Sequence, residues 1–274
     1  MRRQWLPRTG QACVAVWLAL LAGCASAFAQ DRPAFAPRSP NPPEDKPSET
    51  EPPISYGVEI AFRSGHADRG FLISDRPVVQ PVAWTSGSIA DFSIWSSFTL
   101  AETTDHSRPT ILELELTREH EWGNLTIGPA VRTFFYHDPL SPYSTRSIEG
   151  WLSVSYRAGP FRLFTNHSLD VLTYRGAYFG EAGIESERRV SQRVEVGGSV
   201  GAGWASSRFN DAYADVAKST LDRVRVTGWL TAHVNPRYYI GPRFEFSTIM
   251  NHGVRAELAR PTFVLVGLTT GVEF

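Results

Sequence analysis

An alternation of apolar and polar residues constrains this chain more than any other feature of its sequence. In the first alternating segment, Ile54, Tyr56, Val58, Ile60 and Phe62 share one face, and mostly small or charged residues share the other. A period of two residues indicates a β-strand with one apolar face. About twelve such segments can be counted, each about ten or more residues long, whereas strands average about five or six residues. We therefore expect an all-β chain with unusually long strands.

The links between these segments alternate in length as well. Long links such as 64–77 and 205–220 alternate with short ones such as 86–88 and 235–236. Long loops at one end and tight turns at the other are typical of transmembrane barrels, whose strands are alternating segments of about ten residues. The predicted fold class is an antiparallel transmembrane β-barrel of about 12 strands, with a range of about 10 to 14.

The first thirty residues predict export. Three arginines flank an apolar stretch from Ala12 to Ala22, which has the length and the basic flank of a secretory signal. An A-x-A cleavage site ends at Ala29, whereas the Leu-Ala-Gly-Cys sequence that ends at Cys24 is similar to a lipobox, at which Cys24 would carry lipid. Residues 1–29 are the predicted signal peptide, and lipidation at Cys24 stays an alternative.

Two further segments follow the signal peptide. Residues 30–53 contain eight prolines among serine and acidic residues, which predicts a disordered, proline-rich periplasmic segment. Residues 54–274 form the predicted barrel. Both cysteines precede residue 30, so cleavage after Ala29 leaves no thiol for catalysis or metal binding. No apolar run of about 18 residues follows residue 30, so no membrane-spanning helix is expected.

The C-terminal segment is the most specific signal for location. Val264, Val266, Leu268 and Val272 alternate up to a terminal Phe274, which resembles the insertion signal of bacterial outer-membrane barrels. The predicted location is the outer membrane of a Gram-negative cell, and the predicted partners are outer-membrane lipid and the barrel-assembly machinery. A formal net charge of −1 excludes a basic nucleic-acid binder.

The face opposite the apolar one carries many charged residues. If the apolar face contacts lipid, nine carboxylates, seven arginines and one histidine point into the barrel. An unpaired charge in a narrow, partly dry lumen is costly, so a near balance of charge predicts ion pairs that fill the interior. Rings of fixed charge that select ions or small solutes are the functional alternative. The predicted lumen-lining residues are Glu59, Arg63, Glu113, Glu115, Arg132, Glu149, Arg162, Glu181, Glu185, Arg193, Glu195, Arg223, Arg225, His233, Arg243, Glu245 and Glu273.

Aromatic residues near the strand ends predict girdles at the two membrane interfaces, where amphipathic rings prefer the headgroup level. The candidates are Tyr56, Trp122, Trp151, Tyr156, Tyr178, Trp204, Tyr238 and Tyr239.

One short stretch has the residue types of a hydrolase. Asn166, His167, Ser168 and Asp170 lie within five residues of one another. Neighbours on a strand point to opposite faces, so His167 cannot serve Ser168 as a base. We expect no catalytic residue, no metal site and no cofactor.

A motif-like stretch lies between Phe62 and Ser97, and it comprises Arg69-Gly70, Ser74-Asp75, Pro77, Gln80-Pro81, Trp84 and Trp95-Ser96. It resembles the N-terminal signature of a family of uncharacterised bacterial outer-membrane β-barrel proteins, which are conserved proteins of unknown function. The resemblance implies fold and location and contributes no functional residue. A weaker second resemblance is to barrels of similar size that scaffold peptidoglycan enzymes.

The function predicted from the sequence is a narrow pore or solute-uptake channel with an Arg/Glu-lined interior. One alternative is a structural or scaffolding barrel whose partners meet the 30–53 segment, and another is a lipid-modifying outer-membrane enzyme. The rival to the whole scheme is a lipidated periplasmic β-protein attached through Cys24, in which the apolar faces would form a sandwich core.

Overall fold

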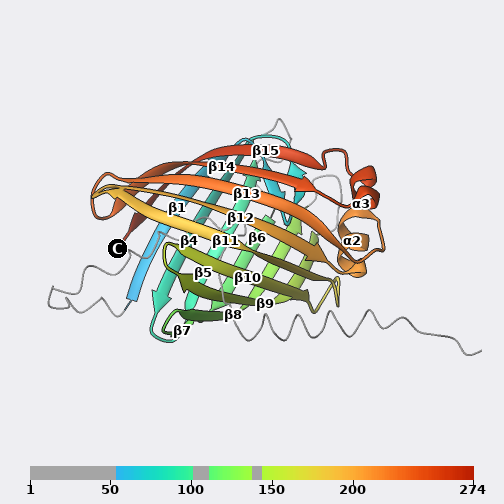
Figure 1. Ribbon diagram of the computed structural model, residues 1–274, viewed down its shortest axis with the longest axis horizontal. Helices are drawn as coiled ribbons and strands as arrows, with labels where there is room; N and C mark the ends of the chain where they lie inside the picture. The colour runs from blue at the N-terminus through green and yellow to red at the C-terminus, as the bar shows by residue number, and fades with distance from the viewer. Residues whose placement is uncertain (1–53, 101–110, 138–143) are drawn as a thin grey trace, which may run out of the picture.

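The computed structural model describes residues 54–100, 111–137 and 144–274 of the chain (Figure 1). The predicted signal peptide, the proline-rich segment 30–53 and the candidate lipidation site Cys24 lie outside the described residues.

Twelve long antiparallel strands form a closed ring. In chain order they are β1 (Ile54–Arg63), β4 (Val78–Gly87), β5 (Asp91–Thr99), β6 (Ile111–Thr117), β8 (Leu125–His137), β9 (Ser144–Ala158), β10 (Phe161–Asp170), β11 (Tyr178–Ser191), β12 (Val194–Ala205), β13 (Thr220–His233), β14 (Tyr238–Ile249) and β15 (Thr262–Glu273). Each strand pairs with the next, and β15 pairs with β1 to close the ring. The short strand β7 (His120–Trp122) continues β6 along β8. The predicted barrel of about 12 strands is confirmed.

Closure explains how such long strands persist in a membrane. Hydrocarbon offers no water to bond to backbone N–H and C=O groups, so a spanning sheet must satisfy them all between its own strands. The pairing of β1 with β15 removes the two edges that an open sheet would expose. Among the described residues, no helix is long and apolar enough to cross a membrane.

The two ends of the barrel differ. Both Ile54 and Phe274 lie at one end, which we call the turn end, and its connections are short, such as 159–160 and 192–193. The opposite end, the loop end, carries the longer connections, and Figure 1 shows its two helices away from the C-terminus. The elements in these connections are the strands β2 (His66–Asp68) and β3 (Phe71–Ser74) and the helices α2 (Ser207–Ala214) and α3 (His252–Glu257).

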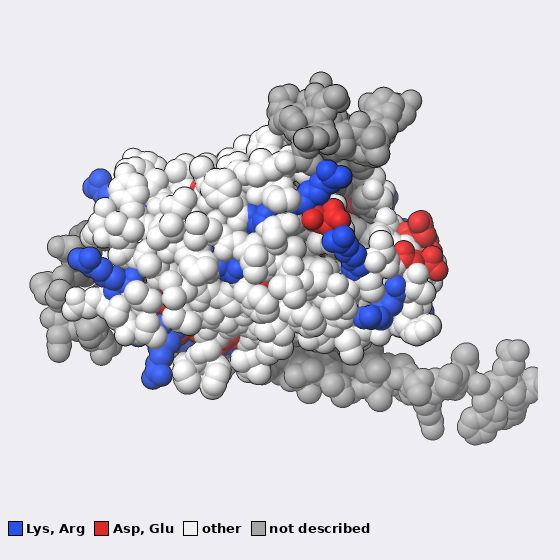
Figure 2. Space-filling view, turned by 90° about the horizontal axis from the view of Figure 1, so that it is seen from above, with Lys and Arg blue, Asp and Glu red and all other residues white. Residues whose placement is uncertain are grey.

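Large apolar side chains cover the outside of the barrel. On β1 the outward residues Val58, Ile60 and Phe62 are 41–49% exposed, and on β15 Val264 and Val266 are more than half exposed. Figure 2 shows a surface that is largely free of charge across its middle, with most charged side chains toward the two ends. An apolar band around a closed barrel is the surface that contacts lipid.

The inside of the barrel is filled with polar side chains. Glu59, Glu181 and Ser247 have 1% exposure or less, although all three are polar. At the loop end the filling is apolar instead, because Phe71, Phe209, Ile249 and Val254 form one buried cluster with neighbouring residues. This cluster joins β3, both helices and the barrel wall.

Candidate functional site

The connection between β1 and β4 folds into the barrel as a hairpin of β2 and β3. Its turn consists of Arg69 (φ +48°) and Gly70 (φ +86°), and two successive residues with positive φ form the tight turn that suits a β-hairpin. In the described residues β2 and β3 pair only with each other, whereas β1 and β4 pair directly along their whole length. The hairpin is therefore an insertion that the barrel ladder does not need.

The tip of this hairpin is bonded to the barrel wall by Arg69. Its Nη1 and Nη2 atoms donate hydrogen bonds of 2.8 and 2.6 Å to the two carboxylate oxygens of Glu149 on β9. Its Nε atom lies 3.6 Å from Oδ1 of Asp68. Both Arg69 and Glu149 are 3% exposed. A paired, doubly hydrogen-bonded guanidinium is one of the strongest polar contacts that a protein interior accommodates.

The register of the strands explains why Glu149 needs this partner. Glu115, Arg132, Glu149 and Asp170 lie directly opposite one another across β6, β8, β9 and β10. The Nε atom of Arg132 contacts the carboxylate of Glu115 and lies 3.4 Å from that of Glu113. Two carboxylates that face each other across a strand pair repel, and Glu149 faces Asp170. Arg69 supplies the compensating charge.

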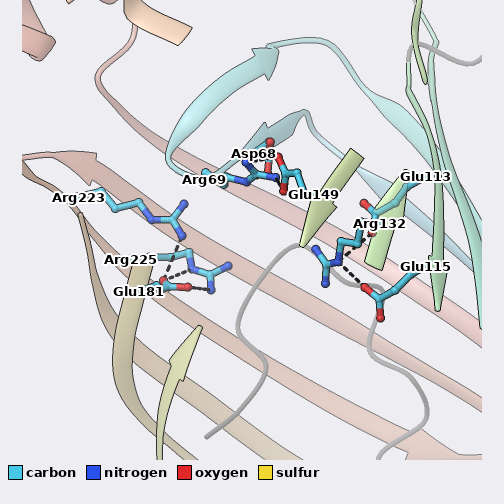
Figure 3. A network of polar contacts seen from close by, with 9 residues as sticks. All are labelled: Asp68, Arg69, Glu113, Glu115, Arg132, Glu149, Glu181, Arg223 and Arg225. Carbon is cyan, nitrogen blue, oxygen red and sulfur yellow. Dashed lines mark hydrogen bonds and ion pairs between the residues drawn. The ribbon is translucent and has the colours of Figure 1, made fainter. Parts of the chain in front are cut away.

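The hairpin tip also reaches a second charged part of the barrel wall (Figure 3). A Cβ atom at Gly70 would lie only 2.6 Å from Cδ of Arg223 on β13, so the tip backbone packs against that side chain. Arg223 and Arg225 both contact Glu181 on β11, at 3.2 and 3.0 Å. The tip therefore bridges two charged patches on different strands of the barrel wall.

An aromatic contact attaches the hairpin to α2. Phe71 of β3 stacks on Tyr213 with ring centroids 5.7 Å apart, and Tyr213 stacks on Phe209 at 4.4 Å. Burial raises the pKa of the Tyr213 phenol above its usual range, so this hydroxyl stays protonated. The hairpin is held by the ion pair of Arg69 at its tip and by the aromatic packing of Phe71 next to the tip.

Other predicted lumen residues form further pairs along the barrel wall. Arg63 contacts Glu245 at 2.7 Å, Arg162 contacts Glu185, and Arg189 contacts Glu195. His233 Nε2 lies 3.6 Å from Glu195, and the Tyr239 hydroxyl donates a 2.7 Å hydrogen bond to Glu59. Arg243 and Glu273 are partly buried on inward positions of β14 and β15.

Three sequence predictions are wrong at the level of single residues. Arg193 is exposed in the short turn between β11 and β12, so it does not line the lumen. The alternation of apolar residues continues through this turn, and periodicity could not locate it. Trp151 and Tyr239 are buried inside the barrel at 6% and 5% exposure, so they belong to no interfacial girdle.

The hairpin and the contacts of Arg69 could not be predicted from the alternation of apolar residues. Strands of three and four residues are too short to show a period of two. The available signal was the Asp68-Arg69-Gly70 sequence inside a long connection, because glycine beside a polar residue marks a tight turn.

His167 and Ser168 point to opposite faces. Ser168 is buried inside, while His167 lies on the outer face, where Nδ1 is 2.7 Å from the Tyr178 hydroxyl and Nε2 is 3.1 Å from the Thr165 hydroxyl. The Thr165 hydroxyl donates to the backbone oxygen of Glu181, so its proton is not directed at His167. This arrangement anchors aromatic and polar side chains and does not activate a nucleophile. The described residues contain no group of three or more potential metal ligands.

No family model and no curated protein matches this chain. Among solved structures it is similar to the NanC porin, at 13% identity and a TM-score of 0.47, over 80% of this chain and 98% of that one. An outer-membrane channel from Pseudomonas putida F1 is similar at 9% identity and a TM-score of 0.47, over 84% of this chain and 100% of the other. The KdgM porin is similar at 9% identity and a TM-score of 0.44, over 80% of this chain and 98% of the other.

These low identities and TM-scores carry no argument about function. The assignment rests on the strand pairing and the surface of this chain itself. A closed antiparallel ring with an apolar outer belt and a polar interior is an outer-membrane β-barrel.

Proposed function

We propose that this barrel is a narrow solute channel that the β2–β3 hairpin closes from the loop end. The observation that carries the proposal is the inserted tip, which is bonded to Glu149 on one wall and packed against Arg223 on another. Because β1 and β4 pair without it, the hairpin can leave the lumen while the backbone ladder of the barrel stays intact.

The chemistry of the wall supports a passage. Twelve strands lie between the eight that side chains fill completely and the sixteen or more that leave an open channel. Buried charges cost desolvation, and each of them must be compensated by a partner in the wall or by a solute. Charged walls serve ions and polar solutes, because they replace part of the hydration that a solute loses on entry.

Proteoliposome swelling tests this proposal. We compare the refolded barrel with a variant in which residues 66–74 are replaced by a short Gly-Ser turn between the paired ends of β1 and β4. We expect the variant to admit small amino acids and sugars much faster than the wild-type barrel. A correctly folded variant that remains as tight as the wild type would contradict the proposal.

A structural or scaffolding barrel is the second candidate, and the dense filling of the interior favours it. The polar side chains of Glu59, Glu181 and Ser247 are almost fully buried. Such a barrel would stay impermeable with or without the hairpin. Its proposed partners would meet the 30–53 segment, so deletion of that segment should change the set of crosslinked proteins. Outer-membrane lipid and the barrel-assembly machinery are proposed partners in either case.

A further inference from the structure

We propose that the position of the Arg69 guanidinium is a binding site for organic cations that carry a guanidinium or ammonium group, and that Arg69 fills this site as a built-in ligand. The inference rests on the proposed channel function, because a solute reaches this site only through the lumen. It also assigns a class of substrate, organic cations, to the proposed channel.

The first part of the site is the carboxylate of Glu149. Each of its two oxygens accepts one hydrogen bond from a different terminal nitrogen of Arg69. This paired geometry matches a planar guanidinium and suits a spherical inorganic cation less well. Glu149 belongs to β9 and not to the hairpin, so it stays in the wall when the hairpin leaves.

The second part is a set of aromatic rings around the same guanidinium. The Cζ atom of Arg69 lies 5.7, 5.8 and 5.6 Å from the ring centroids of Phe134, Trp151 and Phe209. These are cation–π distances, and such contacts select organic cations with weakly hydrated faces. The three rings belong to β8, β9 and α2, so none of them is part of the hairpin itself.

The third part is the local balance of charge. Without the hairpin, the neighbouring wall charges among the described residues are the carboxylates of Glu113, Glu115, Glu149 and Asp170 and the guanidinium of Arg132. Arg132 already contacts Glu113 and Glu115, and its guanidinium lies 3.9 Å from the Trp151 ring centroid. The remaining negative charge is buried, and a buried charge requires a counterion. A cationic solute is the counterion that would replace Arg69.

A second charged wall, which contains Glu181, Arg223 and Arg225, makes the alternative explicit. Glu181 contacts both Arg223 and Arg225, so that patch carries more positive than negative charge. If this wall dominated, the opened lumen would select anions. The selectivity of the opened channel therefore decides between the two walls.

The test is single-channel recording of the Arg69→Ala barrel in planar bilayers, with methylguanidinium as the probe and methylurea as its neutral counterpart. We expect Arg69→Ala to conduct with a cation preference in a KCl gradient. Methylguanidinium should block this current at a concentration about tenfold or more below that of methylurea, because charge-assisted hydrogen bonds contribute more than neutral ones. Adding Glu149→Gln to Arg69→Ala should raise the half-blocking concentration by about tenfold or more.

The matched control is Arg260→Ala. Arg260 forms an ion pair of 3.0 Å with Asp75 next to the hairpin, but both side chains are about half exposed. Exposed pairs contribute little, so this variant should stay as closed as the wild type. If Arg69→Ala is silent, the variant with residues 66–74 replaced takes its place in the same recordings.

The outcomes separate the two proposals. If both variants run as folded barrels in SDS and neither conducts, the channel function fails, and the cation site fails with it. If they conduct but prefer anions, respond equally to methylguanidinium and methylurea, or ignore the Glu149→Gln change, the cation site is overturned and the channel function stands.

Discussion

At the scale of single residues, the stability of the barrel interior depends on whether each buried charge has a partner of opposite charge. Arg69 and Glu149 are both buried, and each is the main counterion of the other. Removing one partner of such a pair costs about 3–5 kcal/mol, because the other charge stays buried without compensation. The alternative for the hairpin is to leave the lumen and return Arg69 to water.

Glu149→Gln should therefore release the hairpin. Trypsin cleaves after exposed arginines, so the Arg69–Gly70 bond, which is protected in the wild type, should be cut in the variant at least about a hundredfold faster. The measurement is limited proteolysis of the refolded barrel, followed by mass spectrometry. Glu245→Gln is the matched control, since it breaks the ion pair with Arg63 and leaves the Arg69–Glu149 pair intact. Equal protection of the bond in both variants would contradict this account of the tip.

A second residue-scale prediction concerns Asn166. Its side chain is 2% exposed, and neither Nδ2 nor Oδ1 has a hydrogen-bond partner in the described part of the chain. Replacing such a group by an apolar one of similar shape is nearly neutral or stabilising. Asn166→Leu should therefore keep or raise the urea midpoint of unfolding in lipid vesicles. Asn210→Leu, which removes a 2.8 Å bond to the Lys218 carbonyl, should lower stability by about 1–3 kcal/mol. A larger loss for Asn166→Leu would show that its amide has an essential partner.

At the scale of elements, the hairpin depends on its turn. Gly70 combines a φ of +86° with close packing, whereas Gly123 has a φ of +60° and open space where a Cβ atom would lie. The long strands could be predicted from the period of two, since each shows several repeats of that pattern. The hairpin could not, because contacts with Glu149 and Phe209 far along the chain determine its place.

Alanine substitutions at Gly70 and Gly123 separate the effect of close packing from the effect of backbone strain. Gly123→Ala should cost only the backbone strain of the left-handed region, about 1–2 kcal/mol. Gly70→Ala should cost the same strain and, in addition, push the tip away from Arg223. We expect tryptic cleavage after Arg69 in Gly70→Ala and not in Gly123→Ala. Cleavage in both or in neither would argue against close packing of the tip.

At the scale of the whole molecule, closure of the ring is the property that the sequence indicated most strongly. Alternation, long strands and the rhythm of long and short links all follow from a sheet with one lipid-facing side. The same parity predicts inward charges at Glu115, Arg132 and Glu181, and all three side chains are buried. The ion pairs of these charges could not be predicted, because they depend on the stagger between strands and on a loop that folds inward.

Closure predicts resistance to SDS. Each of the twelve long strands of the ring is bonded on both sides, so the barrel should stay folded in SDS until it is heated. Boiled and unboiled samples of the membrane fraction should run at different positions on a gel. Identical mobility together with release by an alkaline wash would instead favour a tethered periplasmic protein.

The most direct test of the central claim is the current through single barrels in a planar bilayer, recorded for the wild type and for the variant with residues 66–74 replaced. The occluding hairpin predicts that the wild type is closed for most of the record and that the variant shows stable conductance steps. Steps of the same size and frequency in both proteins would show that the hairpin does not close the lumen. Silence in both folded proteins would show that the barrel is not a channel.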